Sequence, residues 1–109
     1  MATDPLDDFL NYLTHEKRYS PHTISAYRTD LIEFRDYLVV KYEMNDLLDA
    51  NFQIVRSWIA DLMESEIVSR SVNRKISSLR SFFRFHVQGN RIKNNPMLKV
   101  QGPKTSKRL

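Results

Sequence analysis

Apolar residues recur at alternating steps of three and four across residues 20–41, and this spacing limits the fold more than any other feature of the sequence. These residues are Ile24, Tyr27, Leu31, Phe34 and Leu38. An α-helix turns once in about 3.6 residues, so they share one helix face, whereas a half-buried strand would alternate at every second residue. Ser20 can cap such a helix, and Pro21 suits its first position. The pattern predicts a helix from about Ser20 to Lys41.

Three further stretches have the same helical spacing. They predict helices over about 4–17 and 51–66, and a fourth helix of about 18 residues that begins after Ser69 or Ser71 and stops at Gly89. Their inner faces are formed by Leu6, Phe9, Leu10 and Leu13, by Phe52, Val55, Trp58, Ile59, Leu62 and Met63, and by Val72, Ile76, Leu79, Phe83 and His86, respectively. Their candidate caps are Thr3 or Asp4, Asp49 or Asn51, and Ser69 or Ser71. Gly89 offers a left-handed end to the last helix. Phe82 and Phe85 fall off the inner face, and we expect one of them to support the turn that follows or to contact another protein.

The remaining segments predict short connections. Residues 42–51 interrupt the helical pattern, and the Asn-Pro pair at 95–96 opens a short last turn that ends at residue 100. Only two glycines and four prolines occur among the 109 residues, which is typical of helices joined by short loops. We therefore predict an all-α fold, a bundle of four helices plus a short fifth helical turn, in one domain of residues 1–100. Residues 101–109 have the composition of a linker.

Charge is divided along the chain instead of being mixed. Residues 1–66 carry all 13 acidic residues and six basic ones, a net −7, whereas residues 67–109 carry eleven basic residues and no acidic one, a net +11. A solvated face normally carries both signs, so a merely solubilising run of charge is the weaker interpretation. A one-sided positive field attracts a polyanion, which indicates nucleic acid as the partner.

Basic and small polar residues occupy the outer face of the last predicted helix. At about 100° per residue, the arc opposite its apolar face holds Arg70, Asn73, Arg74, Ser77, Ser81 and Arg84, with Ser78 and Arg80 at the flanks and Lys75 nearer the core. Arginine pairs with phosphate or guanine through two hydrogen bonds, and small neighbours allow close approach. The arc predicts a helix that lies against DNA; a solvent-facing helix that is only basic is the alternative.

The opening turns of this helix strengthen the prediction. The positive end of a helix dipole disfavours arginine. Arg70 and Arg74 nevertheless occupy those turns, and no carboxylate is expected to offset them. A bound phosphate would resolve the conflict, because helix N-termini attract anions.

A second polar cluster lies at the N-terminal end of the helix predicted from Ser20. It comprises Ser20, His22, Thr23, Ser25 and Arg28, and no acidic residue follows before Asp30. Hydroxyls and backbone amides in such a cluster can hold a phosphate. Each residue alone also has an alternative role: Ser20 can be a helix cap, and the Thr23 hydroxyl can hydrogen-bond to the nearby backbone.

Catalytic and metal sites are not expected. Ser20, His22 and Asp30 are the residue types of a hydrolytic triad without a recognised spacing, and capping already explains Ser20. His15, His22 and His86 lie on three segments with no pair at ligand spacing, and cysteine is absent. No glycine-rich phosphate loop occurs, so we expect no cofactor and no small-molecule substrate.

A membrane location is not expected either. The first ten residues are acidic where a signal peptide would be basic, and no apolar run approaches the roughly 20 residues that span a bilayer. The absence of cysteine fits a reducing compartment. We expect a cytoplasmic protein.

Three segments carry a resemblance to a known family. They are YSPHTISAYRTDLIEFRDYL, then SRSVNRKISSLRSFFRF about 50 positions later, and NNPMLKV before the pair Pro103-Lys104. In order and spacing they resemble the N-terminal SAM-like, or core-binding, domain of the tyrosine recombinases of the Xer and phage-integrase group. The resemblance covers nearly the whole chain.

The resemblance implies both a fold and a role. It implies a SAM-like orthogonal bundle that clamps one face of a DNA half-site during integration or recombination, with the second and fourth helices against the major groove and the nearby phosphates. It implies contacts with other recombinase protomers in a tetramer, to which the first helix contributes. It also adds basic linker residues to the expected DNA-binding set, namely Lys104, Lys107 and Arg108.

The resemblance also implies what the chain lacks. The family's catalytic residues belong to a following domain, so this fragment is not expected to cut DNA, and none of its five tyrosines is expected to act as the nucleophile. Chromosome-dimer resolution and mobile-element integration both remain open, with the Xer-like motifs favouring the former. Two other classes compete: a SAM-type protein-interaction module and a stand-alone helix-turn-helix regulator.

Overall fold

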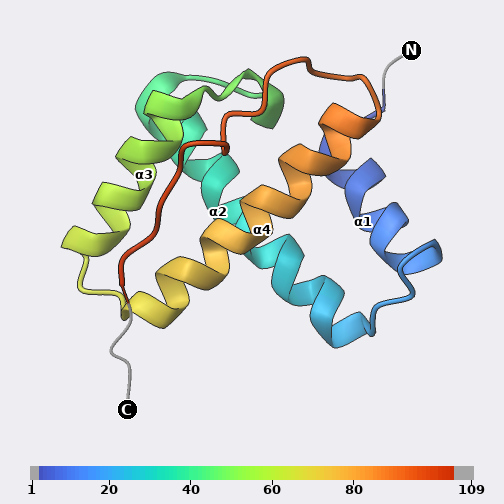
Figure 1. The fold of residues 1–109 in the computed structure, drawn as a ribbon, viewed down its shortest axis with the longest axis horizontal. Coiled ribbons are helices and arrows are strands. Elements are labelled where there is room, and N and C mark those ends of the chain that lie inside the picture. Colours follow the sequence, from blue (N-terminus) through green and yellow to red (C-terminus); the bar gives the residue numbers. More distant parts are fainter. Residues whose placement is uncertain (1–2, 105–109) are drawn as a thin grey trace.

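The chain folds into α-helices joined by short connections (Figure 1). A computed structural model describes residues 3–104. In this range it contains α1 (Pro5–His15), α2 (Pro21–Tyr42), the 3-10 helix η1 (Leu47–Asp49), α3 (Phe52–Glu64) and α4 (Ser69–Gln88), and no strand. The all-α prediction is confirmed, and η1 lies in the segment that was expected to be a loop.

The two longest helices, α2 and α4, cross each other, and the two shorter ones flank the crossing. In Figure 1, α1 lies on one side of the crossing and α3 on the other. α4 contacts all three other α-helices. Because α4 is surrounded in this way, only part of its circumference is open to a partner.

Side-chain caps start three of the helices. Asp4, Ser20 and Asn51 accept hydrogen bonds from the backbone amides of Asp7, Thr23 and Ile54 at 3.2, 3.2 and 2.9 Å, respectively. Each cap satisfies an amide that has no partner within the helix. These three predictions of a helix start are confirmed.

Both ends of α4 differ from the prediction. Val68 has extended backbone angles and occupies the cap position, where it makes no side-chain hydrogen bond, so Ser69 already belongs to the helix and neither Ser69 nor Ser71 caps it. At the other end Gly89 has a φ of −83° and is not left-handed. Asn90 takes the left-handed conformation, with a φ of 62°, which asparagine tolerates better than most residues.

The core is apolar and rich in aromatic side chains. Phe9, Phe34, Phe82 and Phe83 are fully buried. Phe82, which was expected to lie off the inner face of α4, is fully buried, because α1 covers that flank and places the centroid of the Phe9 ring 5.6 Å from that of Phe82, edge to face. Met63 was expected inside and is half exposed, since the inner face of α3 is formed by Ile54, Val55, Trp58 and Ile59.

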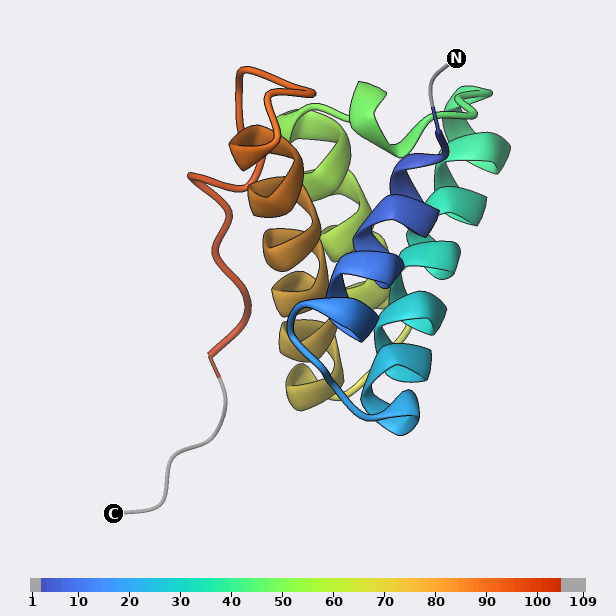
Figure 2. The same cartoon turned by 90° about the vertical axis from the view of Figure 1, so that its right-hand side faces the viewer.

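The segment after α4 packs back onto the bundle. Residues 96–99 form a hydrogen-bonded turn instead of an α-helix, and they bury Met97 and Val100. The chain then runs back along α4 toward its N-terminal end, as Figures 1 and 2 show. Asn73 donates a hydrogen bond to the carbonyl of Pro103 at 2.9 Å. Residues 101–104, the described part of the predicted linker, therefore lie against α4.

Candidate nucleic-acid interface

The two polar surfaces predicted from the sequence meet in one groove. α2 contributes His22, Thr23, Ala26 and Tyr27, α4 contributes Arg74, Ser77 and Ser78, and Asp30 lies between the helices. The hollow has a volume of about 310 Å³. We call it the α2–α4 groove. The crossing of the two helices creates it, because their ends diverge on either side of the contact.

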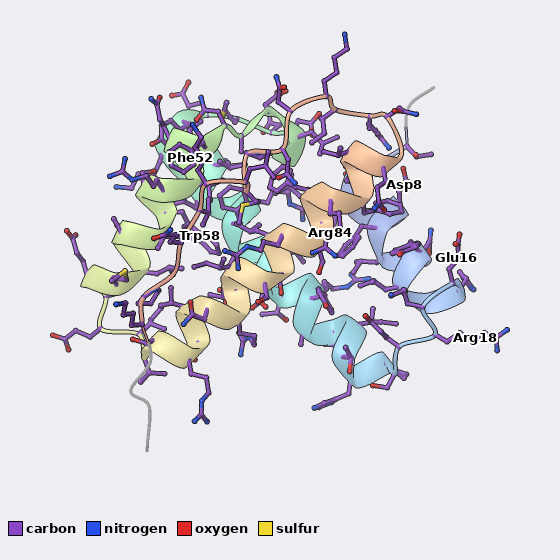
Figure 3. The ribbon with its side chains drawn as sticks, in the orientation of Figure 1. Asp8, Glu16, Arg18, Phe52, Trp58 and Arg84 are labelled. Carbon is purple, nitrogen blue, oxygen red and sulfur yellow. The ribbon has the colours of Figure 1, made fainter. Side chains whose placement is uncertain are left out.

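Two exposed cations of α4 lie toward the two ends of its polar face. Arg70 and Arg84 are exposed, and no ion pair among residues 3–104 involves either guanidinium. Arg84, labelled in Figure 3, also borders a cavity of about 90 Å³ near Lys17 and Tyr19. Both cations are free to meet phosphate.

Asp30 organises the middle of that face. It is 1% exposed and binds the α4 side chains around it. Arg74 donates from Nη2 to Oδ1 at 2.8 Å and from Nε to Oδ2 at 3.3 Å, and Ser78 Oγ donates to Oδ2 at 2.7 Å. Lys75 binds the same carboxylate at 3.4 Å and also pairs with Glu33. We refer to these five residues as the Asp30 cluster.

The cluster corrects two expectations. The expectation that no carboxylate offsets the arginines of the opening turns is wrong for Arg74, because Asp30 of α2 reaches it across the crossing. The Lys75 side chain is 8% exposed, so its ammonium is turned to the two carboxylates and away from the predicted DNA-facing surface. The hydrogen bond to Asp30 is the main cause that raises the pKa of Arg74 above its ordinary value.

Two more residues that were predicted to contact DNA bind the C-terminal segment instead. Asn73 binds Pro103, and Arg80 Nη2 donates to the carbonyl of Val100 at 2.8 Å. Both side chains are half-buried. On α4 this leaves Ser77 exposed and Ser81 partly exposed beside the arginines. The polar residues that helical geometry places on one arc of α4 thus have three different surroundings: some face solvent, some belong to the Asp30 cluster, and some bind the C-terminal segment.

The N-terminal end of α2 supplies exposed polar groups. Ser20, His22, Thr23, Ser25 and Arg28 are all exposed. Ser20 accepts from the Thr23 amide as the helix cap and donates to the Thr23 hydroxyl at 3.1 Å, so the competing role as a cap is observed. The first turn of α2 contains no acidic residue. The remaining groups of the cluster are open to an anion.

The basic residues of the C-terminal segment are only partly covered by the structure. Lys104 is exposed at the end of the described range. Lys107 and Arg108 lie outside the described residues. Their expected contact with DNA stays a prediction.

Sequence reasoning missed the role of Asp30 and Glu33. Asp30 was weighed only as the orienting member of a triad, whereas both of its oxygens are bound by α4. A signal was present, since Asp30 lies between Tyr27 and Phe34 on the apolar face of α2. A carboxylate on a buried face needs a cation or several donors.

In residues 3–104 no three His, Asp or Glu side chains come together as metal ligands would. Within the same range no helix combines the length and apolarity needed to cross a bilayer. The α2–α4 groove, flanked by Arg70 and Arg84, is the candidate nucleic-acid interface.

The fold defines the class of this protein, a small all-helical domain built around a crossed helix pair. The family described as phage integrase, N-terminal SAM-like domain, matches residues 6–90. The chain belongs to this family, which confirms the resemblance found in its motifs.

Curated relatives agree with this assignment. The chain is 40% identical over 102 residues to tyrosine recombinase XerC of Oceanobacillus iheyensis, covering 94% of this chain and 33% of the relative. It is 33% identical over 104 residues to tyrosine recombinase XerD of Rickettsia bellii, covering 95% of this chain and 33% of the relative. The chain thus spans about a third of the length of the curated relatives it matches. No solved structure matches it.

Proposed function

We propose that this chain is the DNA-clamping domain of a Xer-type site-specific tyrosine recombinase and binds duplex DNA at a recombination half-site. The observation that carries the proposal is that Arg70 and Arg84, on either side of the α2–α4 groove, are exposed and form no ion pair within residues 3–104. Membership of the integrase family and similarity to proteins named tyrosine recombinases support it. An acidic protein partner would bind the same charges, so an experiment on this surface must distinguish such a partner from DNA.

The geometry suggests how the duplex is held. The polar face of α4 approaches the major groove, and the N-terminal end of α2 meets an adjacent phosphate with Thr23, Ser25 and Arg28. Arg70 and Arg84 neutralise phosphates on the flanks. Small side chains such as Ser77 between the arginines let the helix come close to the bases.

The rest of the recombinase follows as part of the proposal. Cleavage and strand exchange belong to a separate catalytic domain that residues 101–109 link to the bundle. Other protomers of the recombinase assemble with this one on the DNA. The protein works in the bacterial cytoplasm, in chromosome-dimer resolution or in integration of a mobile element.

Salt-dependent binding tests the proposal. If about six phosphates are neutralised, affinity for a duplex falls about a thousandfold between 50 and 200 mM salt, and the slope of log affinity against log salt is about −5. Fluorescence anisotropy with a labelled duplex measures both. Arg84→Ala is expected to weaken binding and to reduce the size of the slope by about 0.9.

A matched control removes an exposed arginine elsewhere. Arg56 lies on α3 and does not border the α2–α4 groove, so Arg56→Ala is expected to bind DNA like the original chain. Equal affinity of Arg84→Ala and the original chain contradicts the proposed surface. Absence of duplex binding at 50 mM salt, with helix content intact, favours the protein-interaction alternative.

A further inference from the structure

Arg74 is held from one side. Its Nε and Nη2 each donate one hydrogen bond to a different oxygen of Asp30. A guanidinium carries five N–H groups in one plane. Three therefore remain: one N–H of Nη1 and the second N–H of Nη2 point in parallel from the outer edge formed by these two nitrogens, and the other N–H of Nη1 points to the side opposite Nε–H. This free edge still offers two parallel donors.

The free edge is accessible. The Arg74 side chain is 54% exposed, whereas Asp30 is 1% exposed. Arg74 borders the α2–α4 groove together with Thr23 and Ser77, whose short side chains leave room above it. A flat group that enters the groove can meet the outer edge of the guanidinium.

The carboxylate behind Arg74 is itself fixed. Ser78 Oγ donates to one oxygen of Asp30 at 2.7 Å, and Lys75 binds the other at 3.4 Å. Arg74 is therefore anchored at its Nε and Nη2 before a ligand arrives. Fixing a flexible arginine beforehand lowers the entropy lost on binding and makes the direction of its remaining hydrogen bonds specific.

The charge of Arg74 is already offset. The Asp30 cluster combines two carboxylates, Asp30 and Glu33, with two cations, Arg74 and Lys75, so its net charge is zero. Attraction to phosphates, and the counterion release that makes it salt-dependent, need uncompensated positive charge. Arg74 thus suits directional hydrogen bonding, whereas Arg70 and Arg84 suit phosphate.

We propose that Arg74, positioned by Asp30, reads a guanine in the major groove, donating from Nη1 and Nη2 to its O6 and N7. The arrangement matches guanine because this base presents two adjacent acceptors there, which no other base does. The inference rests on the proposed DNA-binding function and adds a specificity-determining pair to it. Asp30 is the positioning residue, and Arg74 is the residue that touches the base.

Selection from a pool of random duplexes tests the assignment. The chain, Arg74→Ala, Arg74→Lys and Arg84→Ala are each used to enrich bound DNA at 50 mM salt, and the enriched pools are sequenced. The original chain is expected to enrich guanine at one position. Both Arg74 variants are expected to lose the preference for guanine at that position and to keep any sequence preferences at the other positions. Arg84→Ala, the matched control on the same helix, keeps the guanine and binds every sequence more weakly.

Two further measurements separate a base contact from a phosphate contact. Replacing that guanine by 7-deazaguanine removes the N7 acceptor and is expected to weaken binding of the original chain about tenfold, while Arg74→Ala does not distinguish the two duplexes. The salt slope is expected to stay nearly unchanged in Arg74→Ala and to shrink by about 0.9 in Arg84→Ala. The 7-deazaguanine comparison needs no variant, so it holds even if a substitution impairs folding.

The outcomes distinguish this inference from the function on which it rests. If the chain binds duplexes with a steep salt slope, but Arg74→Ala shrinks the slope by about 0.9 and weakens all sequences alike, Arg74 is a phosphate contact and the inference is overturned. It is also overturned if the original chain enriches no guanine or ignores 7-deazaguanine. If the chain fails to bind any duplex at 50 mM salt, the proposed function falls first, and this inference falls with it.

Discussion

Replacing Asp30 by asparagine tests how the Asp30 cluster stabilises the fold. The side chain keeps its shape, but one acceptor oxygen becomes an NH₂ group and the negative charge is lost. Asp30 accepts four hydrogen bonds, two from Arg74 and one each from Lys75 and Ser78. After the substitution at least one of these donors faces another donor. Lys75, which is 8% exposed, keeps only Glu33 as a counterion.

The expected loss follows from burial. Removing one partner of a buried ion pair typically destabilises a protein by about 3–5 kcal/mol. Arg74 is half exposed and can be hydrated, and Glu33 remains beside Lys75, so we expect the lower end, about 3 kcal/mol. With an unfolding entropy of about 2.1 cal/mol/K per residue, this corresponds to a Tm lower by roughly 13 °C for a chain of 109 residues.

Urea unfolding followed by circular dichroism measures the change. Asp36→Asn is the matched control, because Asp36 is an exposed residue of the same helix; it should stay within about 0.5 kcal/mol of the original chain. Lys75→Met removes the buried cation, so Asp30→Asn should lower the free energy of unfolding by less in the Lys75→Met background than in the original chain. The reasoning is refuted if Asp30→Asn is as stable as the original chain, because the carboxylate would then contribute nothing to the crossing of α2 and α4.

Three other predictions concern the ends of α4 and the segment behind it. Burial, the largest cause, holds the pKa of His86 below its usual 6.5, so the unfolded chain takes up the proton at a higher pH than the folded chain. The free energy of unfolding should therefore fall as the pH drops from 7.5 through 6.5. Urea unfolding measures this change, and His86→Gln should remove this part of the pH dependence. In Gly102→Ala the new Cβ would lie 1.9 Å from Asn73 Oδ1, so the hydrogen bond from Asn73 to Pro103 should be lost, and exchange of the Val100 amide, which is bonded to Met97, should accelerate while the bundle stays folded. Arg91 pairs with Asp8 at 2.6 Å, and Arg91→Ala should cost about 1 kcal/mol and speed amide exchange in α1.

The helices could be predicted from the sequence because their signals are local. Apolar spacing located all four, and Asp4, Ser20 and Asn51 cap the helices as expected. The start of α4 could not be assigned in this way, because two serines competed for a cap position that an extended Val68 occupies. Phe82 was misplaced for a related reason, since one helix projected alone does not reveal that a second helix covers its flank.

The candidate site was predictable as a face but not as a set of available groups. Helical geometry places Arg70, Arg74 and Arg84 on one side of α4, and it identifies the polar end of α2 as a second surface. Which arginine is free depends on where α2 crosses α4, and that crossing puts Asp30 opposite Arg74 instead of Arg84. The return of residues 100–103 along α4, which engages Asn73 and Arg80, is likewise tertiary.

The division of charge along the sequence now has a structural explanation. Every ion pair in the described residues joins a carboxylate from residues 1–66 to a cation from residues 67–109. Since α4 has no acidic residue of its own, its cations cannot be neutralised by neighbours one turn away, as they commonly are on solvated helices. They pair only where another helix brings a carboxylate to them, and Arg70 and Arg84 stay available. Salt should therefore separate the two roles, because the ion pairs of the buried Asp30 are screened less than exposed arginines, which lose their attraction to phosphate.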